Sequence, residues 1–407
     1  MKKYDFLILG SSGMQGKIVA RDLLEKGYRV LLTDIYSDDS RKLTAKHANG
    51  SFRYLDVRQF RKLVEVARQS GADIVVNCAY SDYNLIVYRA CLQAKVNVID
   101  LEGDIKMTEK QLAMSRAFEK RGLTAITGCG STPGINNVML NYAQRQFDCL
   151  ETVNAGFAWD SNIKKFVPPF SVQSIIWEFT QPAWIVKNGK RIKRNPLENI
   201  VEMDFKYVGR QNCFLVEHPE TFTFYHYYRD KGLRNINFYA SFPKHTTEVI
   251  STLIALGLGG NDKLIVDGSL KVAPADLLAE VFRRLPYPEG YTEEENLWVE
   301  IIGQRNGEPK RVLMECHAPT LPGWEDAGCN IDTGFPASII ARMIKDGRIR
   351  ERGSFAPEAI VPEEEFFKEL WNKGMVVYQD GVPVNGEAIA EPARPSRGRA
   401  RQIEAFV

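Results

Sequence analysis

Three glycines follow the first apolar run of the chain, in the segment Gly10-Ser-Ser-Gly13-Met-Gln-Gly16. At a turn from a strand to a helix, glycines let backbone N–H groups approach a diphosphate, and the start of the helix also attracts an anion. A glycine triplet alone is weak evidence, and a tight turn is the alternative, but its place after a buried strand favours a dinucleotide site. The residues predicted to contact the cofactor there are Gly10, Ser12, Gly13, Met14, Gln15 and Gly16.

A carboxylate stands where the ribose of such a cofactor would lie. Asp34 closes the second apolar run, about 20 residues beyond the glycines, where a carboxylate accepts hydrogen bonds from ribose hydroxyls. This position predicts NAD, with NADP as the alternative cofactor, whereas a solvated strand end is the plainer interpretation of Asp34. Asp56 is predicted to contact the adenine, and the crevice is predicted to be bordered further by Cys78, Ala79 and Tyr80.

Three carboxylates, Asp100, Glu102 and Asp104, follow the fifth apolar run. Oxidation of an amine by hydride loss needs a base, because an ammonium group of pKa about 10.4 has no free lone pair, and the reverse reaction needs an acid. Neighbouring carboxylates repel one another, which raises a pKa toward that task. We therefore predict Asp100 and Glu102 as catalytic groups, with capping of a helix near Thr108 as the alternative.

A second glycine-rich loop, Gly-Cys-Gly-Ser-Thr-Pro-Gly at 128–134, leads into a helical pattern. Backbone N–H groups at such a helix start, over 132–135, are predicted to bind a substrate carboxylate. The alternative interpretation of Cys129 is a small side chain that fills space in the core. The alternative interpretation of Asn136 is a polar residue of the first helical turn. The substrate-binding residues predicted in this loop are Cys129, Thr132, Pro133, Gly134 and Asn136.

His245 lies between a strand-like run and the helical segment 248–257. Histidine titrates in the range that proton transfer at neutral pH requires, so we predict it as a catalytic group. A histidine at a helix start or an interface is the alternative.

The first 130 residues alternate between two hydrophobic periods. Short runs rich in Val, Ile and Leu are predicted as buried parallel strands, and the segments between them have the spacing of helices. Strand and helix in alternation predict an α/β fold, a doubly wound Rossmann domain in which the strand ends meet at one edge. The runs are 6–9, 30–32, 74–76, 96–99 and 124–126, with helical spacing within 18–24, 60–67, 85–92 and 112–118.

After about residue 150 the pattern changes. Aromatic-rich alternation at 222–228 and 237–242, and two runs that flank an Asn-Gly turn at 306–307, predict a second α+β domain with a mixed or antiparallel sheet. Near 333 a helical pattern returns, with Pro336 at its start and Gly347 as its stop, and we expect it to dock onto the first domain. A further helix at 363–374 and a hairpin at 376–384 follow.

Composition excludes several classes of protein. The 407 residues are 44% hydrophobic and 26% charged, with a net charge of +2, which speaks against a disordered chain and against nucleic acid or a membrane surface as partner. No uncharged stretch is long enough to span a bilayer. The seven cysteines form no C-x-x-C pair, so we expect a cytoplasmic protein without a metal site.

Several segments together resemble the saccharopine dehydrogenase-like family. The amino-terminal half of the chain is most similar to lysine 6-dehydrogenase. The carboxy-terminal segments of the chain are similar also to saccharopine reductases and carboxynorspermidine dehydrogenases. The resemblance implies NAD(P)-linked redox chemistry at a C–N bond of an amino acid or polyamine-type substrate, and a middle domain that binds substrate and builds a homodimer. The segments are GSSGMQG, VVNCAYSDYN, VNVIDLEGD, AITGCGSTPGINNVM, FSVQSIIWEFTQPAWIVKNGK, SFPKHT and TGFPASIIARMIKDGRIRERGSFAPE.

The chain departs from that family at two runs, one of which is 155–161, where the family usually has a Gly-Gly-Leu-Pro segment. Where the family usually has Arg-Tyr-Pro-Gly-His, this chain has Ser241-Phe-Pro-Lys244-His245. Lys244 replaces the charge of the arginine without its planar, bidentate geometry, and we predict it in substrate binding.

The expected division is 1–130, completed by 325–385, for the cofactor domain; 131–324 for the substrate and dimerisation domain; and 386–407 for a basic, disordered tail. Three alternatives to an amine dehydrogenase stay open: an imine reductase of the carboxynorspermidine or saccharopine type, a non-catalytic NAD-binding sensor, and a short-chain dehydrogenase. The last needs a helical Tyr-x-x-x-Lys, and its single match, Tyr227 to Lys231, is predicted outside a helix.

Overall fold

The computed structural model describes residues 3–168, 172–198, 200–285 and 288–386. The predicted disordered tail lies, beyond residue 386, outside the described residues. Within the described ranges, no helix is long and apolar enough to cross a membrane.

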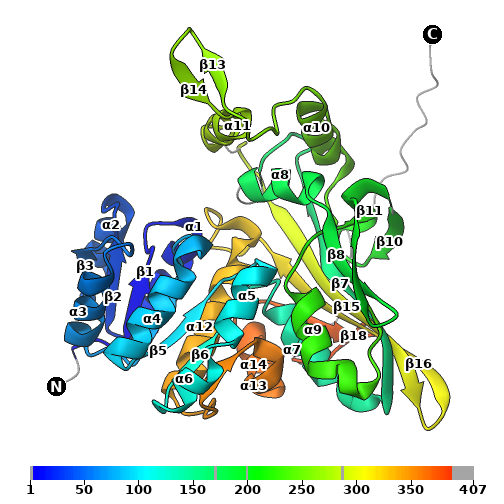
Figure 1. The fold of residues 1–407 in the computed structure, drawn as a ribbon, viewed down its shortest axis with the longest axis horizontal. Coiled ribbons are helices and arrows are strands. Elements are labelled where there is room, and N and C mark those ends of the chain that lie inside the picture. Colours follow the sequence, from blue (N-terminus) through cyan, green and yellow to red (C-terminus); the bar gives the residue numbers. More distant parts are fainter. Residues whose placement is uncertain (1–2, 169–171, 199, 286–287, 387–407) are drawn as a thin grey trace.

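Seven parallel strands form the first sheet, in the order β17-β6-β5-β4-β1-β2-β3 (Figure 1). This confirms the doubly wound Rossmann fold. β17 pairs with β6 from more than 200 residues further along the chain, so the edge of the sheet is completed by a late segment. The strands are β1 (Phe6–Leu9), β2 (Val30–Asp34), β3 (Gly50–Tyr54), β4 (Ile74–Asn77), β5 (Asn97–Asp100), β6 (Thr124–Ile126) and β17 (Gly353–Phe355).

Helices cover both faces of this sheet. Along β1, Phe6 and Ile8 join one apolar cluster, and Leu7 and Leu9 join the other, because side chains of a strand alternate between faces. On one side α12 packs on α1, and on the other α3 packs on α4. The helices of this part are α1 (Met14–Glu25), α2 (Asp38–Lys46), α3 (Phe60–Ser70), α4 (Asn84–Ala94), α5 (Ile105–Leu112), α6 (Ser115–Glu119), α12 (Ile331–Lys345), α13 (Pro357–Ile360) and α14 (Glu363–Trp371).

Two helix boundaries differ from the predictions. The segment 112–118, predicted as helical, spans the end of α5 and most of α6, because the helix is interrupted between Leu112 and Ser115. α12 begins at Ile331, so Pro336 lies inside the helix rather than at its start. A proline there cannot donate the helical hydrogen bond to the carbonyl group of Asp332.

The second sheet has ten strands, in the order β10-β11-β12-β7-β15-β16-β18-β19, with β8 and β9 attached to β12. β12 is parallel to β7 and the other pairs are antiparallel, which confirms the predicted mixed sheet. Asn306 and Gly307, both at positive φ, form the tight turn between β15 and β16. The strands are β7 (Cys149–Ser161), β8 (Ala183–Lys187), β9 (Lys190–Arg194), β10 (Val201–Phe205), β11 (Gly209–Leu215), β12 (Asn235–Ser241), β15 (Glu293–Arg305), β16 (Glu308–Pro319), β18 (Val376–Gln379) and β19 (Val382–Pro383).

One predicted strand is a helix. The aromatic run 222–228 belongs to α9 (Glu220–Tyr228), in which Glu220, Phe224 and Tyr228 are buried at a spacing of four, the period of one helix face. Tyr227 is therefore helical, contrary to the prediction, but it forms no pair with Lys231. The Tyr227 hydroxyl accepts from the N–H of Ala356, whereas Lys231 donates to Gln144.

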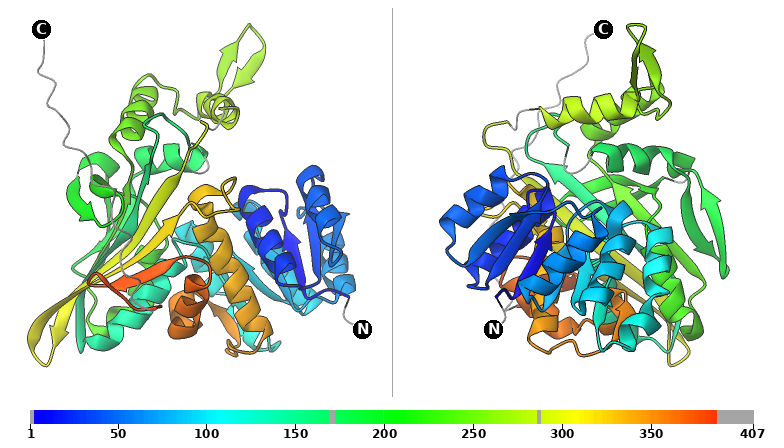
Figure 2. Two further views of the ribbon diagram at one scale, coloured as in Figure 1. Left: turned by 180° about the vertical axis from the view of Figure 1, so that it is seen from behind. Right: turned by 60° about the vertical axis from the view of Figure 1, so that its left-hand side comes forward.

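The remaining elements flank the second sheet. The hairpin of β13 (Leu264–Val266) and β14 (Leu270–Val272) projects away from the rest of the molecule, next to α11 (Figures 1 and 2). The hairpin β18–β19 pairs with β16 of the second sheet, although we expected the whole of 325–385 to complete the first domain. The other helices are α7 (Ile135–Ala143), α8 (Val172–Thr180), α10 (Lys244–Ala255) and α11 (Pro274–Arg283).

Candidate functional site

The glycine turn after β1 is packed too closely for side chains. Gly10 has φ of +75°, and a Cβ atom there would lie 2.7 Å from the carbonyl carbon of Cys78. A Cβ atom on Gly16 would lie 2.0 Å from the carbonyl oxygen of Gly10. Both glycines are therefore required for α1 to approach the ends of β1 and β4.

The start of α1 fits a diphosphate. Its N-cap residue Gly13 makes no side-chain capping bond, and Met14 in the first turn is 45% exposed. The N–H groups of a first helical turn have no partner within the helix, so this turn offers donors to an anion. The residues present thus fit the dinucleotide that the sequence predicts.

Asp34 is fixed beside this turn. Its carboxylate accepts from the N–H of Ser12 at 2.9 Å and from that of Tyr36 at 3.0 Å. The residue is only 8% exposed, so a solvated strand end does not describe it. The Ser12 hydroxyl bonds to Tyr36 and Ser40 and so holds the loop that carries Asp34.

The other predicted cofactor residues have varied surroundings. Asp56 is held by the Arg58 guanidinium, whose hydrogen bonds lower the pKa of the carboxyl. Cys78 and Ala79 are half-buried against Gly10, and burial raises the pKa of the Cys78 thiol to about 12. Tyr80 is 81% exposed.

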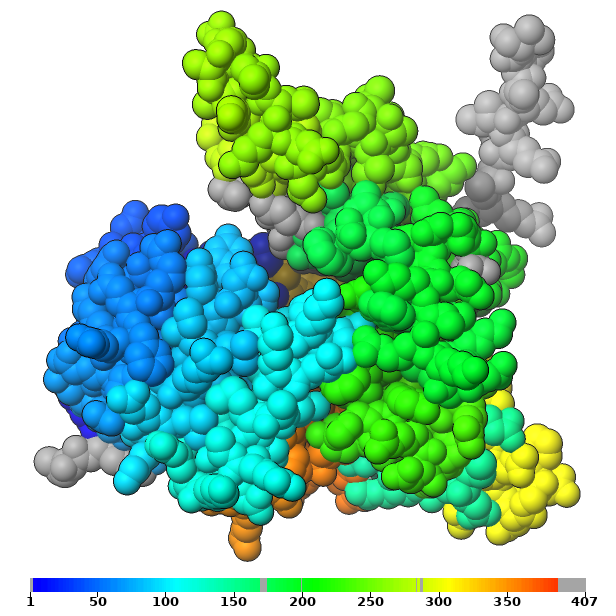
Figure 3. Space-filling model, in the orientation of Figure 1, coloured from blue at the N-terminus to red at the C-terminus, as the bar shows by residue number. Residues whose placement is uncertain are grey.

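A cavity of about 220 Å³ is lined both by residues of the α1 side and by residues of the second sheet. The hollow between the blue amino-terminal residues and the green residues is visible in Figure 3. Gln15 reaches it from α1 and donates to Asn330 at 3.0 Å. Its lining is Gln15, Ser131, Thr132, Phe157, Ser174, Glu178, His218, Glu295, Cys329, Asn330, Asp332 and Thr333.

Three carboxylates line this cavity: Glu178 of α8, Glu295 of β15 and Asp332 of α12. Burial raises the pKa of each of them, that of Asp332 to about 7, and the charge of Asp332 further raises the pKa of Glu295. Acids that are buried together in this way keep a proton at a higher pH than exposed acids do. The cavity therefore holds a group that can give or take a proton near neutral pH.

His218 faces the same cavity and is backed by a buried acid. Its Nδ1 lies 2.5 Å from Oε2 of Glu220, which is fully buried, and its ring stacks on Phe238 at 4.0 Å. A carboxylate at Nδ1 places the ring proton there and leaves Nε2 for a reacting group. This is the arrangement of a histidine that transfers protons and is steadied by a carboxylate.

The predicted carboxylates after β5 lie elsewhere. Asp100 is fully buried and accepts from the N–H groups of Glu102 and Gly128. Glu102 is 1% exposed and accepts from Asn84 and from two backbone N–H groups. Burial raises the pKa of Glu102 to about 7, yet neither residue lines the cavity. Asp104 caps α5, as the alternative interpretation stated.

Three backbone donors at the predicted anion site in the loop 128–136 are already engaged. The N–H groups of Gly134, Ile135 and Asn136 donate to Asn137, Gly130 and Ser131. They are therefore not available to a substrate carboxylate. Thr132 lines the cavity, whereas the lining does not include Cys129, Pro133, Gly134 or Asn136, all of which are buried.

Cys129 and Asn136 match their alternative interpretations. Cys129 is fully buried, and this burial raises the pKa of its thiol well above the usual range. The Asn136 amide donates to the carbonyl of Gly156, so it ties α7 to β7.

Lys244 and His245 form the start of α10 and do not line the cavity. The Lys244 side chain is 89% exposed and pairs with Glu248 at 3.6 Å. Burial, followed by the nearby Lys164 charge, lowers the pKa of His245. The structure thus places both residues as the helix-start alternative describes.

Sequence reasoning did not single out Glu178, His218, Glu295 or Asp332. A signal existed for two of them, because Glu178 and Asp332 are charged residues within apolar helical runs, Ile-Ile-Trp-Glu-Phe and Asn-Ile-Asp-Thr-Gly-Phe. A charge in such a run is usually paired or functional.

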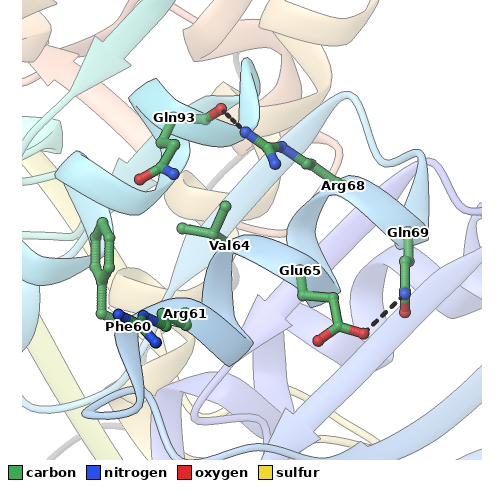
Figure 4. A pocket seen from close by; sticks show the side chains of 7 residues that line it. All are labelled: Phe60, Arg61, Val64, Glu65, Arg68, Gln69 and Gln93. Atoms are coloured by element: carbon green, nitrogen blue, oxygen red, sulfur yellow. Dashed lines mark hydrogen bonds between the residues drawn. The ribbon is translucent and has the colours of Figure 1, made fainter.

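A larger cavity, of about 460 Å³, lies on the outer face of α3. Figure 4 shows its side chains, with Arg68 bonded to the carbonyl of Gln93 and Gln69 bonded to Glu65. Its polar side chains are exposed, and the glycine turn contributes none of its lining. We therefore place the site in the smaller cavity.

Two family models cover most of the chain. Residues 6–126 match the saccharopine dehydrogenase NADP binding domain, and residues 130–375 match the saccharopine dehydrogenase C-terminal domain.

Two characterised proteins and one solved structure are similar to the chain over most of its length. Carboxyaminopropylagmatine dehydrogenase of Synechocystis sp. is 26% identical over 340 residues, which cover 79% of this chain and 83% of that protein. Carboxynorspermidine synthase of Vibrio alginolyticus is 24% identical over 349 residues, 80% of each chain. The structure of saccharopine dehydrogenase (L-Glu forming) from Saccharomyces cerevisiae has a TM-score of 0.74 at 14% identity, with 92% of this chain and 99% of that one covered. The last comparison shows a shared fold.

Proposed function

The chain belongs to the saccharopine dehydrogenase family and is an NAD(P)-dependent oxidoreductase, and we propose that it forms the C–N bond of a secondary amine by reducing an imine. The imine arises from a primary amine and an aldehyde, and its reduction consumes one NAD(P)H and one proton. Both relatives described above are named for polyamine-type products that carry a carboxyl group. Their names favour the imine reductase alternative over the lysine-type oxidation that the amino-terminal half suggests.

One observation carries the proposal: Gln15 of the cofactor helix and His218 of the second half line the same cavity. A bound nicotinamide supplies the hydride. His218 donates its Nε2 proton to the imine nitrogen as the carbon is reduced, and it takes the proton back in the reverse direction. Glu220 fixes the orientation of the ring through its contact with Nδ1.

Asp100 and Glu102 act in this proposal as positioning residues. Through their hydrogen bonds they fix the loops that follow β5 and β6. Asp34 binds the ribose and favours NAD, although the matching family model is named for NADP. Lys244 and His245 take no part in the reaction.

The proposed assembly is a homodimer in the cytoplasm, with 131–324 as its substrate-binding and dimerisation domain. The projecting hairpin exposes Leu264, Ile265, Val266 and Leu270 by 49 to 66%, and an isolated two-stranded hairpin of this kind is unstable in water. Light scattering should give a particle mass of two chains for the wild type. For Ile265→Asp it should give the mass of a single chain. All seven cysteines are free thiols, which fits a reducing compartment.

The direct test is an assay of NADH and NADPH oxidation with pairs of amine and aldehyde. Agmatine, 1,3-diaminopropane and lysine are the first amines to try, each with an amino-acid semialdehyde. Turnover with a polyamine-type pair is the expected result. Tight NADH binding without turnover of any pair would favour the non-catalytic alternative.

A further inference from the structure

The three carboxylates of the cavity come from three separate elements. Glu178 lies on α8, Glu295 on β15 and Asp332 on α12, and all three line the same 220 Å³. Their charges act on one another, since both Asp332 and Glu178 raise the pKa of Glu295. The fold thus brings like charges together at the place where the two sheets meet.

These groups are not satisfied by the protein. Asp332 is 2% exposed, and its Oδ2 has no hydrogen-bond partner among the described residues. The same holds for the buried Oε2 of Glu178. Leaving a buried carboxylate oxygen without a donor is unfavourable unless the group is protonated or a ligand supplies the donor.

No positive side chain meets this need in the described part of the chain. The lining contains neither lysine nor arginine, and the leading influences on the pKa of Glu178, Glu295 and Asp332 are burial and neighbouring polar groups rather than a cation. The described residues also contain no group of three or more ligands arranged to hold a metal ion. An organic cation rich in N–H donors would satisfy these oxygens.

We propose that Glu178, Glu295 and Asp332 form a subsite for a second cationic group of the substrate, an ammonium or guanidinium several bonds away from the reacting nitrogen. This inference rests on the proposed function, because it assigns the amine substrate of that reaction to the diamines and guanidino-amines. His218 faces the same space and serves the reacting nitrogen, while the three carboxylates hold the distant charge. A monoamine of equal length would leave the acids unpartnered and would bind weakly.

Calorimetry with the full-length chain saturated with NADP⁺ or NAD⁺ tests the subsite without any turnover. Agmatine carries an ammonium and a guanidinium, and butylamine carries the ammonium alone. Wild-type protein should bind agmatine at least 10-fold more tightly than butylamine. Asp332→Asn and Glu178→Gln should each weaken agmatine binding 10-fold or more and leave butylamine binding within about 2-fold.

Glu294→Gln is the matched control, because Glu294 is the neighbour of Glu295 on β15 and its side chain is 47% exposed. It should bind agmatine as the wild type does. If Asp332→Asn fails to fold, as judged by lost cofactor binding, Glu178→Gln on the separate helix α8 decides. Equal affinity of the wild type for agmatine and butylamine, or unchanged agmatine binding in Glu178→Gln, would overturn the subsite.

The two proposals fail in different experiments. Loss of agmatine discrimination with intact redox turnover would remove the subsite and keep the proposed function. Selective agmatine binding without turnover of any amine and aldehyde pair would support the subsite and remove the proposed reaction.

Discussion

Glu295 and Asp332 face each other across the junction of the two halves of the molecule, where burial and the charge of Asp332 raise the pKa of Glu295. Glu295 belongs to β15 at the centre of the second sheet, whereas Asp332 belongs to α12, which packs on the cofactor helix α1. Two buried acids that repel each other do not both ionise readily, so the junction is sensitive to pH. Residues 37 positions apart thus connect the cofactor half to the substrate half.

Asp332→Asn should stabilise the protein at alkaline pH. Burial, together with the charge of Glu293, raises the pKa of Asp332 in the folded state to about 7, so the folded chain binds a proton more tightly than the unfolded chain. Stability from this group is full below the ordinary carboxyl pKa of about 4 and is lost as pH rises through the raised value. The wild-type Tm should therefore fall relative to that of Asp332→Asn between pH 5 and pH 8, by about 2–4 °C. A Tm difference between the wild type and Asp332→Asn that stays constant from pH 5 to 8 would contradict this. So would the same pH-dependent difference in Glu294→Gln.

His218→Gln should lower kcat by roughly 10²–10⁴-fold, because it removes the proton donor. Glu220→Gln should lower kcat less, since the imidazole stays but loses the carboxylate that orients its ring. NADH binding, followed by fluorescence, should stay within about 2-fold in both variants. His226→Gln is the control, because His226 is exposed on the neighbouring α9. A kcat unchanged in His218→Gln would place the proton transfer elsewhere.

Asp34→Ala should change cofactor preference. Loss of the ribose acceptor should weaken NADH binding roughly 10- to 100-fold and NADPH binding far less, because the 2′-phosphate cannot use the carboxylate. Asp39→Ala, an exposed carboxylate on α2, is the control. Equal loss for both cofactors would indicate that Asp34 only holds the Ser12 loop, and full NADH affinity would refute the assignment.

Gly16→Ala should abolish cofactor binding and destabilise the chain. The added methyl group would meet the Gly10 carbonyl oxygen at 2.0 Å, so the backbone of the turn must move. Gly103→Ala should be tolerated, because nothing lies within 4 Å of a Cβ atom at that position. Thermal unfolding and NADH titration of the two variants measure the difference, and a Gly16→Ala protein that binds NADH normally would contradict the packing argument.

The local part of the account could be predicted from the sequence. The glycine turn and Asp34 lie within one strand-helix-strand unit, so their spacing alone indicates how they meet. The chemistry at the junction could not be predicted, because three elements and one loop supply its residues and their meeting depends on how the sheets dock. The residues are Glu178, Glu295 and Asp332 in α8, β15 and α12, and His218 in the loop before α9. The sequence also predicted the carboxylates after β5 as catalytic groups. In the structure, Asp100 and Glu102 instead accept hydrogen bonds from backbone N–H groups of their own loop.

The aromatic run at 222–228 shows a second limit. Its alternation of aromatic and polar residues fits a strand, and the same letters place Phe224 and Tyr228 on one helix face. Only the packing of α9 against β12 decides between the two periods.

The most direct test of the central claim follows the hydride itself. NADH and NADPH labelled with deuterium at C4 of the nicotinamide, in each stereochemical form, are incubated with the protein, agmatine and an amino-acid semialdehyde, and the products are analysed by mass spectrometry. The account predicts a secondary amine that carries one deuterium on the carbon next to the new C–N bond, and its loss in His218→Gln. Consumption of neither cofactor, or a product labelled on a hydroxyl-bearing carbon with no C–N bond formed, would contradict it.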